Sequence, residues 1–73
     1  MFDLKQLLEI REQLDRSGRI REILDDEGKV LPSPRAMEQV EREHAGKSET
    51  ERYGLAQCLT LLELADKYRE ELN

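Results

Sequence analysis

The residues around position 46 come closest to a chemical motif in this 73-residue chain. Gly46, Lys47 and Ser48 match the end of the G-x-x-x-x-G-K-S loop, whose glycines let the backbone wrap phosphates after a β-strand. Glu41 stands where that loop has its first glycine, and the residues before it predict a helix. Because a carboxylate there would repel phosphate, the sequence argues against nucleotide binding.

His44 and Cys58 are the only histidine and the only cysteine of the chain. A lone histidine in the last turn of a helix interacts with the helix dipole and needs no catalytic role. A cysteine on an apolar stripe behaves as a small buried hydrophobic residue. Together they provide too few ligands for a zinc site. We therefore predict no metal, no cofactor and no catalytic residue, and we expect the protein not to be an enzyme.

Three arginines, Arg16, Arg19 and Arg21, flank Ser17-Gly18 in a chain of net charge −5. The planar guanidinium group binds carboxylates and phosphates through two parallel hydrogen bonds, so the cluster is a candidate surface for an acidic partner. The alternative is local pairing with acids four residues away, which is typical of solvated helix faces. Both interpretations stay open.

The region from Glu38 to Leu55 has the spacing of a helix-turn-helix, with Gly46 in the turn. A nucleic-acid contact would then use Lys47, Ser48 and Arg52. The motif needs small and apolar residues where this chain has Arg42 and Arg52, so a plain helical hairpin is favoured. Seventeen acidic residues against twelve basic ones also disfavour phosphate binding.

The last third of the chain is the clearest predicted element. Ser48 and Glu51 form an S-x-x-E capping box ahead of an apolar run, which predicts the start of a helix. One stripe of that helix is expected to fill the protein's own core: Leu55, Cys58, Leu59, Leu62 and Ala65. A second stripe, Leu61, Leu64 and Tyr68, has the spacing of a helix that binds in a groove or against a second copy. Alternatively, the N-terminal helix covers both stripes.

The chain is predicted as one all-α domain with four segments: an N-terminal helical segment 1–27, a linker 28–33, a short helix 34–45 and a long helix 48–72. We favour one helix kinked at Ser17-Gly18 over two helices in the first segment. Ser33 and Pro34 predict the start of the short helix, and Gly46 predicts its end. The expected fold is a three- or four-helix antiparallel arrangement with the long helix as its spine.

Size and composition favour a cytoplasmic interaction protein. The hydrophobic fraction is 37%, the charged fraction is 40%, and no apolar run is long enough to cross a membrane. Only three residues are aromatic, which disfavours stacking of nucleic-acid bases. A helix over 48–72 would be about 36 Å long, which exceeds the roughly 29 Å diameter of a compact domain of this length. That comparison favours contact with a partner or a second copy.

The leading functional prediction is a non-enzymatic, acidic, protein-binding regulator or adaptor. Inhibition of a larger enzyme complex is one form of it. The contact would use the Leu61, Leu64 and Tyr68 face, together with the arginine cluster or the acidic faces. The alternatives are a helix-turn-helix regulator that binds nucleic acid and a purely structural homodimer. The sequence identifies neither the partner nor the process.

Overall fold

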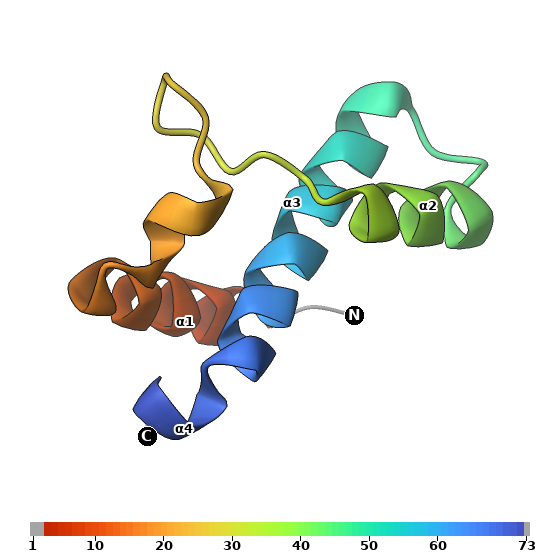
Figure 1. The fold of residues 1–73 in the computed structure, drawn as a ribbon. Coiled ribbons are helices and arrows are strands. Elements are labelled where there is room, and N and C mark those ends of the chain that lie inside the picture. The colour runs from red at the N-terminus through yellow and green to blue at the C-terminus, as the bar shows by residue number, and fades with distance from the viewer. Residues whose placement is uncertain (1–2, 73) are drawn as a thin grey trace.

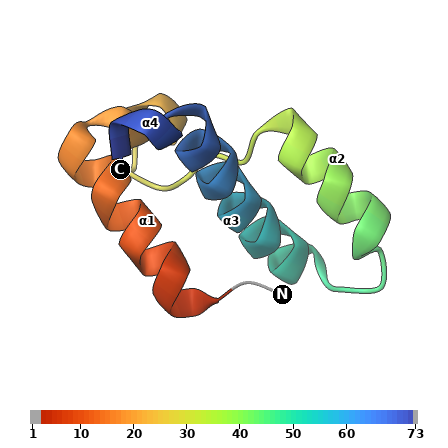
Figure 2. The same ribbon diagram turned by 90° about the horizontal axis from the view of Figure 1, so that it is seen from below.

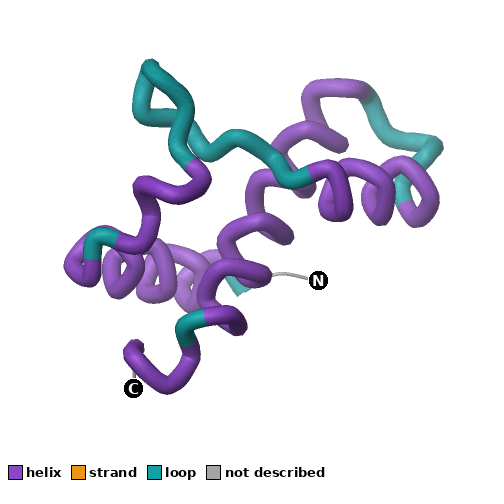
Figure 3. Tube along the Cα trace, in the orientation of Figure 1, coloured by secondary structure: helices purple, strands orange, loops and turns teal. Residues whose placement is uncertain are grey.

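The structure is a computed structural model that describes residues 3–72 of the chain. It has four α-helices and one short 3-10 helix: α1 (Leu4–Ser17), η1 (Arg19–Ile23), α2 (Pro34–Glu43), α3 (Glu49–Lys67) and α4 (Arg69–Leu72). Within this range the extended backbone forms one isolated bridge, between Leu24 and Val30, and no strand (Figure 3). The all-α prediction is confirmed.

Helix α3 lies at the centre of the fold, with α1 on one side and α2 on the other (Figures 1 and 2). Both helices pack on α3, and they do not pack on each other. The core is therefore divided into two clusters. The cluster toward α1 and η1 consists of Leu14, Ile20, Val30, Leu61 and Leu64. The cluster toward α2 consists of Ala36, Val40 and Ala56.

The N-terminal segment 1–27 is not one kinked helix, so that prediction is wrong for the described part; residues 1 and 2 lie outside it. Helix α1 ends at Ser17 because Gly18 adopts the left-handed conformation, with φ at 77°. Its backbone N–H donates to the Asp15 carbonyl at 3.1 Å, as glycine commonly does just past a helix end. The chain then turns into η1, which buries Ile20.

The short helix begins as predicted and ends earlier than predicted. Ser33 is the N-cap of α2, and its hydroxyl accepts from the Ala36 N–H at 3.1 Å. The helix ends at Glu43 rather than at residue 45, because the His44 backbone leaves the helical region with φ at −129°. Gly46 therefore lies in the turn before α3 and does not end α2.

The long helix likewise begins as predicted: Ser48 caps α3, and its hydroxyl accepts from the Glu51 N–H at 3.2 Å. The predicted end at residue 72 is wrong. Helix α3 ends at Lys67, Tyr68 is its C-cap, and the chain turns into α4. Nineteen residues make a helix of about 28 Å, which fits within molecular dimensions of 36 × 27 × 19 Å. The length of α3 therefore gives no reason to expect a partner.

The linker between η1 and α2 is fixed to α3 by side-chain hydrogen bonds. The Ser33 backbone N–H donates to the Thr60 hydroxyl at 3.0 Å, and the Ser33 hydroxyl donates to a Glu63 carboxylate oxygen at 2.6 Å. The Gln57 side-chain amide donates to the Val30 carbonyl at 2.9 Å. These contacts hold Val30 in the core and set where α2 begins.

Candidate functional site

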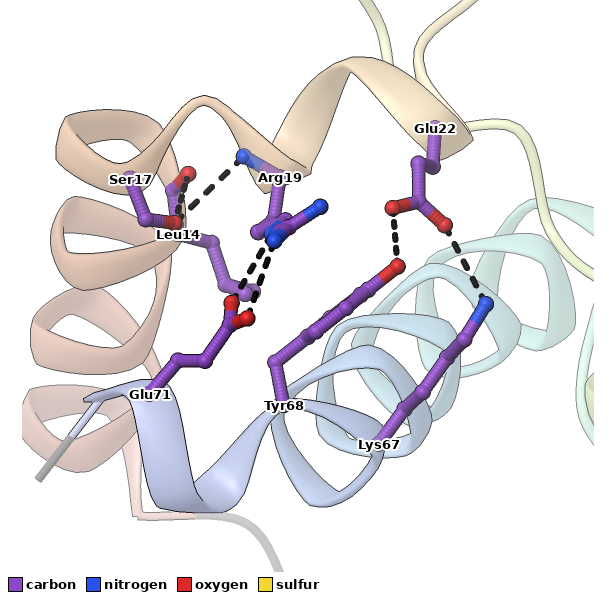
Figure 4. Close-up of polar contacts among 7 residues, drawn as sticks. All are labelled: Leu14, Ser17, Arg19, Glu22, Lys67, Tyr68 and Glu71. Atoms are coloured by element: carbon purple, nitrogen blue, oxygen red, sulfur yellow. Dashed lines mark hydrogen bonds and ion pairs between the residues drawn. The ribbon is translucent and has the colours of Figure 1, made fainter.

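The structure brings together two predicted residues, Arg19 and Tyr68, that the sequence had placed in separate sets (Figure 4). The Nε and Nη2 atoms of Arg19 each donate to one carboxylate oxygen of Glu71 at 2.9 Å. The guanidinium carbon also lies 4.4 Å from the centre of the Tyr68 ring, within the range of a cation–π contact. Arg19 is therefore engaged on two sides by the C-terminal part of the chain.

Glu22 completes this arrangement from the far end of η1. Its carboxylate accepts from the Tyr68 hydroxyl and, at 3.3 Å, from the Lys67 ammonium group. We call these five residues the C-terminal clamp: Arg19, Glu22, Lys67, Tyr68 and Glu71. The clamp joins η1 to the ends of α3 and α4, and it therefore holds the N-terminal third of the chain against the C-terminal part.

The clamp shifts the protonation equilibria of its members. The hydrogen bond from Tyr68 lowers the pKa of Glu22 below its ordinary value of 4.5, and the contacts with Lys67 act in the same direction. The hydrogen bond to Glu22 raises the pKa of Lys67 above 10.5, with a further contribution from Tyr68. The ion pair with Glu71 raises the pKa of Arg19. All three side chains are therefore held in their charged forms.

A pH dependence of stability follows from Glu22. Because the folded state lowers its pKa, its contribution to stability is present above pH 4.5 and is lost as the pH falls through the folded value. We expect Glu22→Gln to flatten the acid side of the curve of unfolding free energy against pH. Urea denaturation at a series of pH values, followed by circular dichroism, measures this.

Two further variants separate the clamp from general charge effects. Glu9→Gln removes an exposed carboxylate of α1 that lies outside the clamp, and it should leave the acid side of the curve unchanged. Tyr68→Phe removes only the hydroxyl and should reproduce part of the Glu22→Gln effect. Equal acid sensitivity in wild type and Glu22→Gln would show that the Glu22 contacts do not form in solution.

Leu61 and Leu64 do not form an outward face. They are 7% and 5% exposed and belong to the core cluster that α1 and η1 cover, and Tyr68 packs against the same cluster. The prediction that this stripe is left over for a partner is therefore wrong in its premise. The stripe expected in the core is only partly buried: Leu55, Cys58, Leu59, Leu62 and Ala65. Leu61 and Leu64 face the cluster with Leu14, Ile20 and Val30. Leu55 and Leu59 pack beside the smaller cluster toward α2.

The arginine cluster is divided by the structure. Arg19 pairs with Glu71, which is 52 residues away, and not with an acid on its own helical segment. Arg16 and Arg21 are exposed, and within residues 3–72 neither forms an ion pair with the acids expected from i,i+4 spacing. Arg16 and Arg21 therefore remain candidates for contact with a partner, whereas Arg19 already has partners within the chain.

The residues of the nucleic-acid alternative lie at the start of α3: Lys47 and Ser48 precede the helix, Arg52 lies in its first turn, and each has a local partner. Lys47 pairs with Glu51 at 3.9 Å, and the Ser48 hydroxyl caps the helix. Arg52 donates to the Ala45 carbonyl at 3.3 Å. These contacts give all three side chains a role in the α2–α3 hairpin.

Sequence reasoning missed Leu4 and Leu8 as surface residues. They are 71% and 60% exposed, and they lie one turn apart on α1. The buried residues of α1 are Leu7 and Leu14, seven residues apart, which define the side that faces α3. The sequence did contain an indication of this exposure, because α1 has more large apolar residues than one buried stripe of a helix can hold. Two other large hydrophobic residues are exposed, Leu31 and Tyr53.

The described residues offer little for metal or membrane chemistry. No group of three or more His, Cys, Asp or Glu side chains in this part of the chain is arranged to hold a metal ion. None of the helices within residues 3–72 combines the length and apolar character needed to cross a membrane. Comparison of the chain with protein-family models, with curated proteins and with solved structures found no match.

Proposed function

We propose that this protein is a non-enzymatic binding protein that recognises a protein partner through α1. The observation that carries the proposal is the exposure of two large apolar side chains of α1, Leu4 and Leu8, at 71% and 60%. Residues four apart on a helix are neighbours on its surface, so the two leucines form one continuous apolar area. Apolar surface of this kind is typical of interaction sites.

The arrangement of the fold supports an adaptor or regulator role. Helix α1 packs on α3 through Leu14, and η1, which follows α1, is joined to α4 by the clamp, so the face with Leu4 and Leu8 is presented on a fixed element. A pre-organised helix face loses little conformational entropy on binding. The net charge of −5 adds a long-range field that favours partners with basic surroundings. An inhibitor of a larger enzyme complex is one form that such a protein takes.

The test is a binding measurement on a reconstituted complex. Proteins captured from native cell extract by the wild-type chain are purified, and the binary complex is titrated by calorimetry. We expect Leu4→Glu/Leu8→Glu to weaken binding by at least about tenfold, because two apolar contacts are lost and two charges are desolvated. Since both sites are exposed, the variant should keep the circular dichroism spectrum of the wild type.

Leu31→Glu is the matched control, because it makes the same change at an exposed leucine outside α1. It should bind as the wild type does. Equal binding by wild type and Leu4→Glu/Leu8→Glu would show that α1 is not the interaction face. Light scattering on the purified chain covers the homodimer alternative: a dimer that Leu8→Glu dissociates would show that the face binds a second copy.

A further inference from the structure

A hollow of about 250 Å³ lies between α1, the linker and α3. Arg11 and Lys29 line it, Gly54 and Cys58 contribute the α3 wall, and the buried side chains of Val30 and Leu61 also lie along it. Arg11 follows Leu8 by three residues and Leu4 by seven, so the hollow continues the same face of α1. The exposed leucines and the hollow therefore form one surface.

The charge of this hollow is opposite to that of the whole chain. Its lining includes two cationic side chains and no acidic one, although the chain has seventeen acids and twelve bases. The Lys29 backbone N–H donates to the Asp25 carboxylate at 2.9 Å. The Lys29 ammonium group pairs with Glu27 at 3.7 Å, and both side chains of that pair are largely exposed. Exposed pairs of this kind are weak. Burial raises the pKa of the Cys58 thiol, which keeps the thiol uncharged at neutral pH.

Gly54 provides an independent reason to regard the hollow as a binding feature. It lies inside α3, where glycine destabilises a helix relative to alanine. No atom lies within 4 Å of the position that its Cβ would occupy, so no packing contact requires glycine there. The absence of a side chain at Gly54 instead leaves the α3 side of the hollow open.

We propose that this hollow receives a carboxylate from the partner of α1, so that the partner segment is an amphipathic helix with an acidic residue beside its apolar ones. The inference rests on the proposed function. Leu4 and Leu8 would cover the apolar residues, and Arg11 and Lys29 would bind the carboxylate. Charge–charge screening acts over about 8 Å at physiological salt, so this local cationic site operates despite the net negative charge.

A displayed library of helical peptides tests the inference without knowledge of the natural partner. All peptides have leucine, isoleucine or phenylalanine at positions i, i+3 or i+4, and i+7. Three panels have acidic, basic or neutral polar residues at the flanking positions. We expect the wild type to enrich the acidic panel, and Arg11→Glu/Lys29→Glu to enrich the basic panel instead. Arg16→Glu/Arg21→Glu makes the same charge change outside the hollow and should still enrich the acidic panel.

The outcomes distinguish this inference from the proposed function. If Leu4→Glu/Leu8→Glu abolishes enrichment while the wild type shows no preference for charge, the inference is wrong and the proposed function stands. If the leucine variant enriches peptides as well as the wild type does, the proposed function is wrong. No enrichment by the wild type contradicts both. Gly54→Gln should weaken binding of the acidic panel without loss of thermal stability, which excludes unfolding as the cause.

The reactivity of Cys58 measures the electrostatic potential of the hollow, because Cys58 lines the hollow and is the only cysteine in the chain. Anionic and cationic methanethiosulfonate reagents both react with its thiolate, so the ratio of their rates depends on local charge and not on the thiol pKa. We expect the ratio of the anionic to the cationic rate to fall by roughly tenfold in Arg11→Glu/Lys29→Glu. An unchanged ratio would show that the two cations do not act at the hollow.

Discussion

Replacement of Leu61 by glutamate is expected to unfold the protein. Leu61 is 7% exposed and packs in the cluster with Leu14, Ile20, Val30 and Leu64. Loss of a buried leucine side chain destabilises a protein by about 2–5 kcal/mol, and an unpaired buried carboxylate adds several kcal/mol more. The total stability of a 73-residue domain is roughly 4–11 kcal/mol. Leu61→Glu should therefore lose its cooperative thermal transition in circular dichroism.

Leu8→Glu is the control for this prediction, because it makes the same chemical change at a side chain that is 60% exposed. Exposed substitutions of this kind change stability by about 0.5 kcal/mol or less, so Leu8→Glu should unfold as the wild type does. Leu61→Ala should remain folded enough to measure a loss of about 2–5 kcal/mol in urea. If the Leu61→Glu variant is well folded, Leu61 is not buried in solution, and the packing of α1 on α3 is contradicted.

Replacement of Thr60 by valine should cost about 1–3 kcal/mol of unfolding free energy, because it leaves the Ser33 backbone N–H without its acceptor. The Thr60 side chain is buried, and its hydroxyl accepts from Ser33 at 3.0 Å while it donates to the Ala56 carbonyl at 2.7 Å. Valine keeps the shape and removes both hydrogen bonds. The urea midpoint should fall while the slope of the transition stays constant.

The variant Thr60→Ser separates the contribution of the Thr60 hydroxyl to stability from that of its methyl group. It retains both hydrogen bonds and removes one buried carbon, which corresponds to about 0.8 kcal/mol. Amide hydrogen exchange gives a local measurement: the Ser33 amide should exchange faster in Thr60→Val than in Thr60→Ser. If Thr60→Val is as stable as the wild type and Ser33 exchanges slowly in both variants, the linker is held by other contacts.

Helix α3 organises the molecule through two adjacent sides. One side of α3 carries Leu61 and Leu64 against α1 and η1, and the adjacent side carries Thr60 under the linker. The same packing leaves Leu4 and Leu8 outside, where they form the proposed interaction face. We therefore expect stability and the proposed binding to depend on different leucines, and variants of the proposed interaction face to leave the core intact.

The amino-acid sequence by itself determined the features that depend on neighbours a few residues apart. Ser33 with Pro34 and Ser48 with Glu51 predicted the starts of α2 and α3, and both serine hydroxyls cap their helices as predicted. The Glu51 carboxylate accepts from the Ser48 hydroxyl, whereas a capping box would use the Ser48 backbone N–H. Helical periodicity predicted the all-α class. These features follow from the sequence because a cap or a helical turn involves residues at most four positions apart.

Only the tertiary structure decided which face of each helix is buried. Helix α3 has apolar residues on two adjacent stripes, and the position of α1 and the linker places Leu61 in the core while Cys58 stays partly exposed. The same is true of Arg19, whose partner Glu71 lies 52 residues away. Nothing in the local spacing specifies these choices, because they depend on which distant segments pack together and on how much apolar surface each packing removes from water.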